Sequence, residues 1–232
     1  MLNRIRQFKA QIRTHNLKGQ WTYFLRWKRA LREGASSVQD EQAWITFAAM
    51  DFLSANLGKQ DKVFEYGGGG STLFFSNRVA EIITVEHNTE WFSILESKMN
   101  EKGFTGWTGK LILPEPNNIL DAPDPAIPEH YASDDALNKG KNFKAYASFI
   151  DQYPDAYFAC VLVDGRARPS CIRHAISKIK PGGFLVLDNS DREYYLRHTG
   201  KLLEKNFSKR LGSFGPTPYL NEFTQTSIWQ KN

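Results

Sequence analysis

The sequence predicts an α/β fold with a doubly wound, mostly parallel seven-stranded sheet, an antiparallel C-terminal hairpin strand and an N-terminal helical extension. First, short apolar runs alternate with segments of helical periodicity between residues 62 and 206, which is typical of parallel strands joined by helices. Second, four glycines, 67–70, directly follow one of the apolar runs. Third, two strand-like segments, 209–214 and 224–229, are joined through Gly215-Pro216-Thr217-Pro218, which predicts a hairpin.

The individual elements follow from these patterns. Strands are expected where apolar residues run together, and helices where apolar residues recur every three to four positions. The expected strands cover 62–66, 82–86, about 109–113, 158–163 and 184–188. The expected helices cover about 38–57, 72–79, 89–102, 168–179 and 191–206. We therefore divide the chain into a helical extension, 1–36, and one α/β domain, 37–232.

The extension is basic and amphipathic. Residues 1–34 contain nine Lys or Arg and one acid, a net charge of +8, whereas the rest of the chain has 21 basic and 24 acidic residues, a net charge of −3. Phe8, Ile12, Trp21 and Trp27 recur among the basic residues. Either these helices contact an anionic membrane, a partner or a second copy of the chain, or they pack against the domain and expose a solvated basic face. Because the excess charge lies in one segment, it does not predict specific nucleic-acid binding.

The composition also bears on the cellular setting. Cys160 and Cys171 have no metal-site spacing and lie in or beside the expected core, which favours a reducing compartment. The sequence has no apolar run long enough for a membrane span and no apolar core of a signal peptide. We therefore expect a cytoplasmic protein.

The stretch from Val63 to Thr72 predicts a ligand-binding turn. An apolar strand precedes the glycines, and Ser71 and Thr72 supply hydroxyl groups suited to the start of a helix. Glycines let the backbone turn sharply and approach a ligand, while the unpaired N–H groups of the helix start face it. A small molecule is expected there.

Two acids restrict the kind of ligand. Glu65 lies two residues before Gly67, where a carboxylate repels a pyrophosphate and attracts an ammonium or sulfonium group. The dinucleotide motif G-x-G-x-x-G fails in both registers, because its third glycine position holds Thr72 or Leu73. Glu86 follows Gly67 by nineteen residues, the spacing at which an acid binds a ribose diol. The expected ligand is therefore a nucleoside with a cationic amino-acid part.

The chain at this point resembles the class I S-adenosylmethionine-dependent methyltransferases, which have a Rossmann-like fold. The resemblance rests on four segments in order: Phe64-Glu65-Tyr66-Gly67-Gly68-Gly69, Val85-Glu86-His87, Val163-Asp164-Gly165-Arg166 and 180–189. It implies S-adenosylmethionine as cofactor, with Glu65 at its amino-acid end and Glu86 at its ribose. The other cofactor-binding residues that it implies are Tyr66, Gly67, Gly68, Gly69, Ser71, Thr72, His87 and Trp91, although the Trp91 ring would serve equally well as helix core.

Oxygen ligands also end the later strands. Asp164 follows the buried run 158–163, where a carboxylate is hard to explain by packing. With Asp188 and Asn189 it resembles the aspartates and asparagine that hold Mg²⁺ in the metal-dependent catechol O-methyltransferase group, so these three residues are candidate Mg²⁺ ligands. The chain departs from that group at Ala167, where a lysine is expected. The alternative is that Asp188 and Asn189 cap the next helix and shape the acceptor pocket.

Arg166 and Arg168 suggest a charged acceptor. Guanidinium groups bind carboxylates and phosphates through paired donors, so these arginines either hold an anionic acceptor or pair with the nearby aspartates. We therefore treat four residues as candidate catalytic residues: Asp164, Arg166, Asp188 and Asn189.

A long irregular insertion, about 115–150, precedes the strand at 158–163. Its prolines interrupt regular structure, and its place in the fold predicts a lid that helps to select the acceptor. A mobile surface loop is the alternative.

Together, these features predict S-adenosylmethionine-dependent methylation of an oxygen, in preference to a nitrogen, on a small-molecule or saccharide-like acceptor. The alternative is a noncatalytic module of the same fold that docks on a membrane or partner through the basic N-terminus. An oxidoreductase of the dinucleotide type is disfavoured by Glu65 and by the missing third glycine.

Overall fold

The sheet has the expected topology. The computed structural model describes residues 2–118 and 122–232, and these residues form the strands β1 (Lys62–Tyr66), β2 (Glu81–Glu86), β3 (Trp107–Leu111), β6 (Phe158–Val163), β7 (Ile179–Asp188), β8 (Phe207–Gly215) and β9 (Thr224–Lys231). Their order in the sheet is β3-β2-β1-β6-β7-β9-β8. The first five strands in this order are parallel, and β9 is antiparallel to both β7 and β8. The mostly parallel sheet with a C-terminal hairpin is confirmed.

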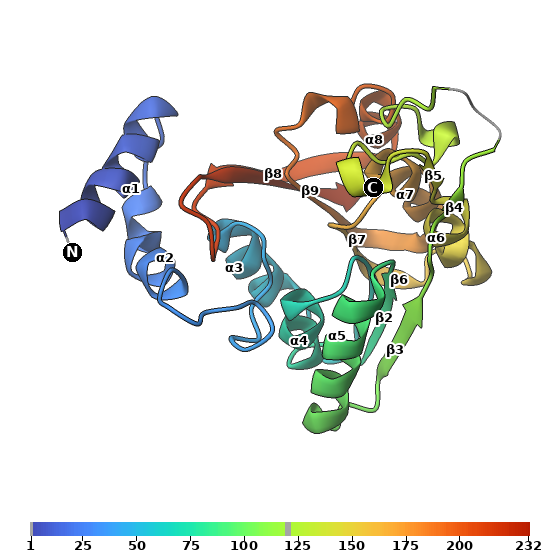
Figure 1. Cartoon of the computed structure of the whole chain (residues 1–232), viewed down its shortest axis with the longest axis horizontal. Coiled ribbons are helices and arrows are strands. Elements are labelled where there is room, and N and C mark those ends of the chain that lie inside the picture. Colours follow the sequence, from blue (N-terminus) through green and yellow to red (C-terminus); the bar gives the residue numbers. More distant parts are fainter. Residues whose placement is uncertain (1, 119–121) are drawn as a thin grey trace.

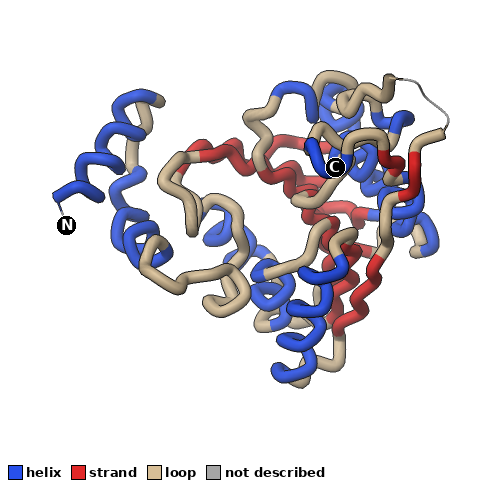
Figure 2. The backbone as a smooth tube through the Cα atoms, in the orientation of Figure 1, coloured by secondary structure: helices blue, strands red, loops and turns tan. Residues whose placement is uncertain are grey.

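Helices cover both faces of this sheet (Figure 1; Figure 2). The α-helices in the described part of the chain are α1 (Leu2–Thr14), α2 (Phe24–Ala30), α3 (Phe47–Asn56), α4 (Gly70–Ser76), α5 (Thr89–Lys102), α6 (Lys144–Ser148), α7 (Arg168–Ala175) and α8 (Gly200–Asn206). Short 3₁₀ turns occur at η1 (Gln20–Tyr23), η2 (Pro128–His130), η3 (Ala136–Asn138), η4 (Phe149–Gln152), η5 (Ile176–Lys178) and η6 (Glu193–Tyr195).

The alternation of side chains along the strands divides the core into two layers. In β1, Phe64 and Tyr66 point toward one face of the sheet and Val63 toward the other, as successive strand residues do. The first layer packs against α6, α7 and α8, and the second against α2, α3 and α4. Each large apolar side chain that is fully buried contributes roughly 1.5–3 kcal/mol to the stability of the folded state. Strands buried on both faces are apolar throughout, so the carboxylate of Glu65 within β1 must have polar partners.

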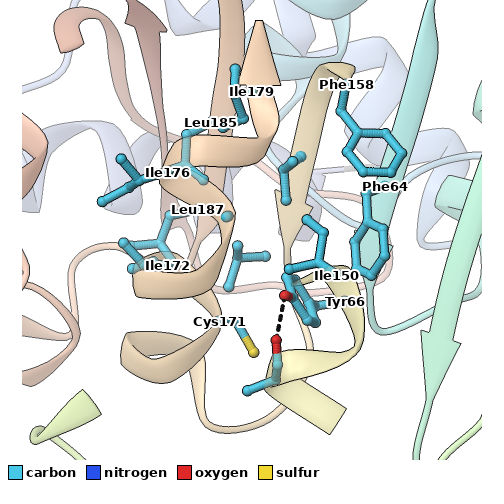
Figure 3. Close-up of a cluster of buried hydrophobic side chains, with 14 of the residues drawn as sticks. Phe64, Tyr66, Ile150, Phe158, Cys171, Ile172, Ile176, Ile179, Leu185 and Leu187 are labelled. Carbon is cyan, nitrogen blue, oxygen red and sulfur yellow. Dashed lines mark hydrogen bonds between the residues drawn. The ribbon is translucent and has the colours of Figure 1, made fainter. Parts of the chain in front are cut away.

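The first layer includes much of the insertion at 115–150. Figure 3 shows Tyr66 in this layer, where its hydroxyl donates a 2.7 Å hydrogen bond to the carbonyl oxygen of Ala147 in α6. Tyr146 and Ile150 are also fully buried. At its base the insertion is closed by β4 (Glu115–Pro116) paired with β5 (Lys141–Asn142). The C-terminal part of the insertion is therefore core, and residues 119–121 lie outside the described residues.

The N-terminal helices pack against the connection between β8 and β9. They lie at the end of the molecule away from β3 (Figure 1). Phe8 and Trp27 are fully buried, and the ring of Phe8 lies 5.2 Å from the rings of both Trp27 and Phe223. Trp27 Nε1 donates a 2.8 Å hydrogen bond to Leu220 O. Many of the side chains that this packing leaves exposed are basic: Arg6, Lys9, Arg13, Lys18 and Arg29. None of the described helices has both the length and the apolar character needed to cross a bilayer.

The boundary of one expected helix is wrong in a way that matters for the site. The helix expected at 38–57 begins only at Phe47, because residues 36–46 form turns in which Gln42 N donates to Ser37 O. The carbonyl oxygens of these two residues lie against Gly70, where a Cβ atom would collide with both. The turns therefore cover the start of α4.

Two other elements differ from expectation near the end of the sheet. The strand expected at 184–188 begins already at Ile179, and the helix expected at 191–206 is split into η6 and α8. Asp188 and Asn189 therefore cap no long helix, and the expected capping is wrong.

Candidate active site

A cavity lies at the carboxyl ends of the central strands of the sheet. β1 lies between β2 and β6, which is the point where the chain reverses its direction of winding. Ligands of doubly wound sheets bind at such points. The cavity has a volume of about 640 Å³, and its walls are formed by Ser37, Trp44, 67–71, 86–88, Trp91, 164–166, Arg168, Asp188, Asn189, Arg192, Leu220 and Thr224.

The glycine turn after β1 forms the floor of the cavity. Gly67 has a φ of 89°, a conformation that favours glycine, and its N–H donates to Val85 O in β2. A Cβ atom on Gly67 would lie 2.9 Å from the backbone of Gly165, in the loop after β6. A Cβ atom on Gly68 would lie 2.5 Å from Thr84 Cγ2. The turn is thus held by tight contacts with strand β2 on one side and with the loop after β6 on the other.

Glu65 lies below this turn and does not line the cavity, which differs from its expected place beside the ligand. It is fully buried, and its Oε2 accepts hydrogen bonds from Thr72 Oγ1 at 2.7 Å and Thr84 Oγ1 at 2.9 Å. Burial raises its pKa to about 7, although nearby hydroxyl groups favour the ionised form. Thr72 Oγ1 in turn accepts from Gly69 N at 3.1 Å, so Glu65 orients the glycine turn through Thr72.

Glu86 ends β2 and lines the cavity on the side of the glycine turn. Its Oε2 accepts a hydrogen bond from Gly68 N at 3.1 Å, and its Oε1 accepts from His87 N at 2.7 Å and Asn88 N at 2.9 Å. Burial opposes ionisation, but the hydrogen bonds and charge of His87 prevail and lower the pKa of Glu86. An ionised carboxylate fixed in this way can accept hydrogen bonds from the two hydroxyls of a ribose.

Trp91 forms the wall next to Glu86. Asn88 caps α5 by accepting a 2.8 Å hydrogen bond from Trp91 N, which places the indole over the glycine turn. Its Nε1 donates to Gly68 O at 2.6 Å, and a Cβ atom on Gly69 would lie 3.2 Å from its Cζ2. The ring is half-buried and is available to stack against an adenine.

Asp164 and Arg168 form an ion pair at the carboxyl end of β6. Arg168 Nη2 donates to Asp164 Oδ1 and to Asp164 O, both at 3.0 Å. Its other donors reach Gly165 O and Asp188 O, so the guanidinium connects the ends of β6 and β7. Burial raises the pKa of Asp164, and the charge of Arg168 opposes this rise. Arg168 is 7% exposed and has little capacity left for a ligand.

The three candidate Mg²⁺ ligands meet at the cavity but do not fit a metal. Asp188 is buried, its Oδ1 accepts a 2.6 Å hydrogen bond from Thr226 Oγ1, and burial raises its pKa. Asp164 is paired with Arg168, whose positive charge repels a divalent cation at the same place. Within residues 2–118 and 122–232 there is no cluster of three or more His, Cys, Asp or Glu able to hold a metal. We therefore assign Mg²⁺ no part in the chemistry of this site.

Arg166 connects the cavity to the insertion. Its Nη2 lies 3.4 Å from Asp135 Oδ2, and its Nε donates to His87 Nε2 at 3.4 Å. The ring of His87 packs against Phe143 and Tyr146 of the insertion. No described residue of the insertion lines the cavity itself. The insertion thus supports the site from behind, whereas a covering lid was expected.

The structure brings most of the expected site residues together. Those that line the cavity are Gly67, Gly68, Gly69, Ser71, Glu86, His87, Trp91, Asp164, Arg166, Asp188 and Asn189. Those that lie behind its wall are Glu65, Tyr66 and Thr72, all fully buried. Six further residues of the wall were not predicted from the sequence: Ser37, Trp44, Asn88, Arg192, Leu220 and Thr224.

The comparisons with known proteins bear on the fold. No known sequence family and no curated protein matches this chain by sequence. Among solved structures, it is similar to an O-methyltransferase from Bacillus cereus in complex with SAH, with 13% identity and a TM-score of 0.57 over 99% of this chain and 100% of that one.

Two RNA-modifying enzymes are similar at the same level. An rRNA methylase from Streptococcus thermophilus has 13% identity and a TM-score of 0.52, covering 79% of this chain and 94% of that one. A tRNA (m1A58) methyltransferase from Aquifex aeolicus has 12% identity and a TM-score of 0.51, covering 85% of this chain and 76% of that one. The chain thus has the Rossmann-like fold of the class I S-adenosylmethionine-dependent methyltransferases.

Proposed function

We propose that this protein transfers a methyl group from S-adenosylmethionine to an oxygen atom of a small, saccharide-like acceptor. The observation that carries the proposal is the glycine turn after β1, where the winding of the sheet reverses, together with Glu86, which three backbone N–H donors fix beside the turn. This arrangement suits a nucleoside whose ribose lies on Glu86 and whose adenine lies on Trp91. The fold is the one in which this chemistry is common, although fold alone assigns no reaction.

The sulfonium of S-adenosylmethionine supplies an activated methyl group, so the protein has mainly to align the acceptor oxygen with it. Asp164 lines the cavity at the end of β6, the strand that lies between β1, which precedes the glycine turn, and β7. Because burial raises its pKa, its carboxylate is a better proton acceptor than an exposed one. We assign it the role of orienting the acceptor hydroxyl and taking its proton, with Arg168 holding the carboxylate in place.

A small acceptor fits the chain better than RNA. Residues outside the first 34 carry a net charge of −3, and nucleic-acid binding depends on basic surface around the site. The cavity is also walled by the turns at 36–46 and by the connection between β8 and β9, which leave a pocket of limited volume. RNA methylation is the competing outcome of an acceptor screen.

Cofactor binding is the first test. Isothermal titration calorimetry with S-adenosylmethionine and S-adenosylhomocysteine should give micromolar dissociation constants. Glu86→Ala removes charge-assisted hydrogen bonds worth roughly 1.5–3 kcal/mol and should weaken binding about 10- to 100-fold. Glu96→Ala, an exposed position of α5, is the matched control and should bind as the wild type does. Absence of binding to both compounds would overturn the proposal.

A second candidate function follows from the outer surface of the extension. Trp21 is 48% exposed and Leu25 is 64% exposed, four residues apart, with Lys18 and Arg29 exposed on either side in the sequence. Exposed aromatic and aliphatic side chains next to basic ones are typical of contact with an anionic bilayer. Co-sedimentation with vesicles containing phosphatidylglycerol, compared with phosphatidylcholine vesicles, tests this candidate. Equal or no binding to the two kinds of vesicle would reject it.

A further inference from the structure

The cavity has two halves on opposite sides of Asp164. The half over β1 and β2 contains the glycine turn, Glu86 and Trp91, which are the groups suited to a nucleoside. The half over β7 and β9 is lined by Trp44, Asn189, Arg192, Leu220 and Thr224. If the proposed cofactor occupies the first half, its methyl group points toward the second. The second half is therefore the place for an acceptor.

One wall of this half presents a flat apolar face. Trp44 is 44% exposed although its neighbours Ala43 and Ile45 are fully buried, so the backbone is anchored while the indole borders the cavity. Its ring meets that of Tyr219 edge to face, with centroids 5.6 Å apart, and Leu220 lies beside it on the same wall. An anchored, half-exposed indole suits stacking against one face of a ring.

The same half of the cavity also presents a positive charge that the protein does not neutralise, the guanidinium of Arg192. Arg192 Nη1 donates to Tyr195 Oη at 3.1 Å, and in the described part of the chain no carboxylate lies within salt-bridge distance of its guanidinium. The nearby Asp188 is buried, and its raised pKa disfavours the ionised form. Arg168 is already paired with Asp164. The uncompensated guanidinium of Arg192 therefore favours an anion.

Two polar groups between these walls are available for hydrogen bonds. Thr224 Oγ1 is buried yet has no hydrogen-bond partner among the described residues. Asn189 has a φ of 49°, and its amide borders the cavity without a side-chain hydrogen bond to any residue that the structure describes. Buried polar groups are usually paired, so the unpaired Thr224 Oγ1 favours a ligand with a hydroxyl group, and the half-buried amide of Asn189 offers a second hydrogen-bonding group beside it.

From this arrangement we infer that the acceptor is a small acidic saccharide, whose ring stacks on Trp44, whose carboxylate or phosphate pairs with Arg192, and whose hydroxyls bond Asn189 and Thr224. This inference rests on the proposed function, because the position of the first half's ligand defines the second half as the acceptor site.

The test measures sugar binding separately from cofactor binding. Saturation-transfer difference NMR on the protein with bound S-adenosylhomocysteine compares glucuronate, galacturonate and glucose 6-phosphate with the neutral sugars glucose and galactose. We expect at least one acidic sugar to bind tenfold or more tightly than its neutral counterpart. Equal binding of acidic and neutral sugars, or preferential binding of 4-hydroxybenzoate or of a short RNA hairpin, would overturn the inference.

Variants locate the bound sugar. Trp44→Ala and Arg192→Gln should each weaken binding of the acidic sugar about tenfold, and Arg192→Gln should also reduce the preference over the neutral sugar. Trp21→Ala and Arg210→Gln change the same residue types at exposed positions away from the cavity and should have no effect. Unchanged sugar binding in the first two variants would refute the inference.

The two proposals fail in different ways. If S-adenosylhomocysteine does not bind, the proposed function fails, and the same NMR titration on the free protein still decides whether the acidic sugar binds. If S-adenosylhomocysteine binds to wild type and to all four variants equally but the sugar preference is absent, only the acceptor class is wrong.

Discussion

The buried carboxylate of Glu65 predicts an unusual pH dependence of stability. Its pKa is raised from 4.5 to about 7 in the folded protein, so the folded state binds a proton more tightly than the unfolded state does. Stability from this group is therefore full below pH 4.5 and is lost as the pH rises through 7. A difference of 2.5 pKa units corresponds to about 3 kcal/mol, of which roughly 2.5 kcal/mol develops between pH 5 and pH 9.

Glu65→Gln isolates this effect, because glutamine resembles the protonated acid in shape and cannot ionise. The free energy of unfolding of the variant, minus that of the wild type, should increase by roughly 2.5 kcal/mol from pH 5 to pH 9. Urea unfolding at one-unit intervals of pH measures it, and the change across pH is independent of any constant cost of the substitution. Glu96→Gln, at an exposed position, should give a difference that is flat with pH. A flat difference for Glu65→Gln as well would refute the reasoning.

Four further outcomes are expected. In a urea titration, Gly165→Ala should lower the free energy of unfolding by more than about 2 kcal/mol, because the added Cβ atom would collide with the buried hydroxyl of Tyr146. Gly58 has open space around it, so Gly58→Ala should change the same quantity by less than about 0.5 kcal/mol. Arg168→Lys should lower the free energy of unfolding by about 2 kcal/mol and the Tm by roughly 5 °C in differential scanning calorimetry. The reason is that an ammonium group has three donors on one nitrogen and cannot reach all four backbone and side-chain acceptors of the guanidinium at once. An unchanged Tm would contradict this. Trp27→Phe removes the hydrogen bond to Leu220 O and should lower the free energy of unfolding in urea by about 1 kcal/mol. The affinity for S-adenosylhomocysteine, measured by calorimetry, should stay unchanged. A weaker affinity would show that the extension also shapes the half of the cavity proposed for the cofactor. EDTA should leave both that affinity and any methyl-transfer rate unchanged, and a tenfold loss that Mg²⁺ restores would show that a metal takes part.

The expected convergence of strand ends was the strongest part of the sequence analysis. The Gly67 turn, Glu86 and Asp164 each follow an apolar run, and parallel strands bring their carboxyl ends to one edge of the sheet. Distance along the chain does not matter for such residues, since the topology alone places them together. This is why residues nearly 100 positions apart could be assigned to one site.

The position of the Glu65 side chain could not be predicted from the sequence. A residue before the glycine turn was expected to face the ligand, but in β1 it points to the same face as Val63 and is covered by Thr72 and Thr84. The pleat of the strand fixes which face a side chain takes, and the helix packed on that face decides whether it reaches the cavity. The second condition depends on tertiary packing, which one sequence does not reveal.

The half of the cavity over β7 and β9 could not be predicted from the sequence for a related reason. Trp44 and Leu220 belong to connecting segments without a motif, and Thr224 is the first residue of β9. They meet only because the turns at 36–46 pack on the connection between β8 and β9. An exposed tryptophan in the sequence looks like any core tryptophan. Trp44 falls within the helix predicted at about 38–57, which the structure shows to begin at Phe47.

The hydrogen bond between Trp27 and Leu220 has a consequence for the order of folding. These residues are 193 positions apart, so the loop that their contact closes includes most of the chain. Closing such a loop costs much conformational entropy unless the intervening structure has already formed. During synthesis the segments that carry the glycine turn, Glu86 and Asp164 have all been made shortly after β6, whereas the wall that carries Leu220 must await the final hairpin. The residues of the two halves of the cavity therefore become available at different times, and the half over β7 and β9 is the last part of the site to form.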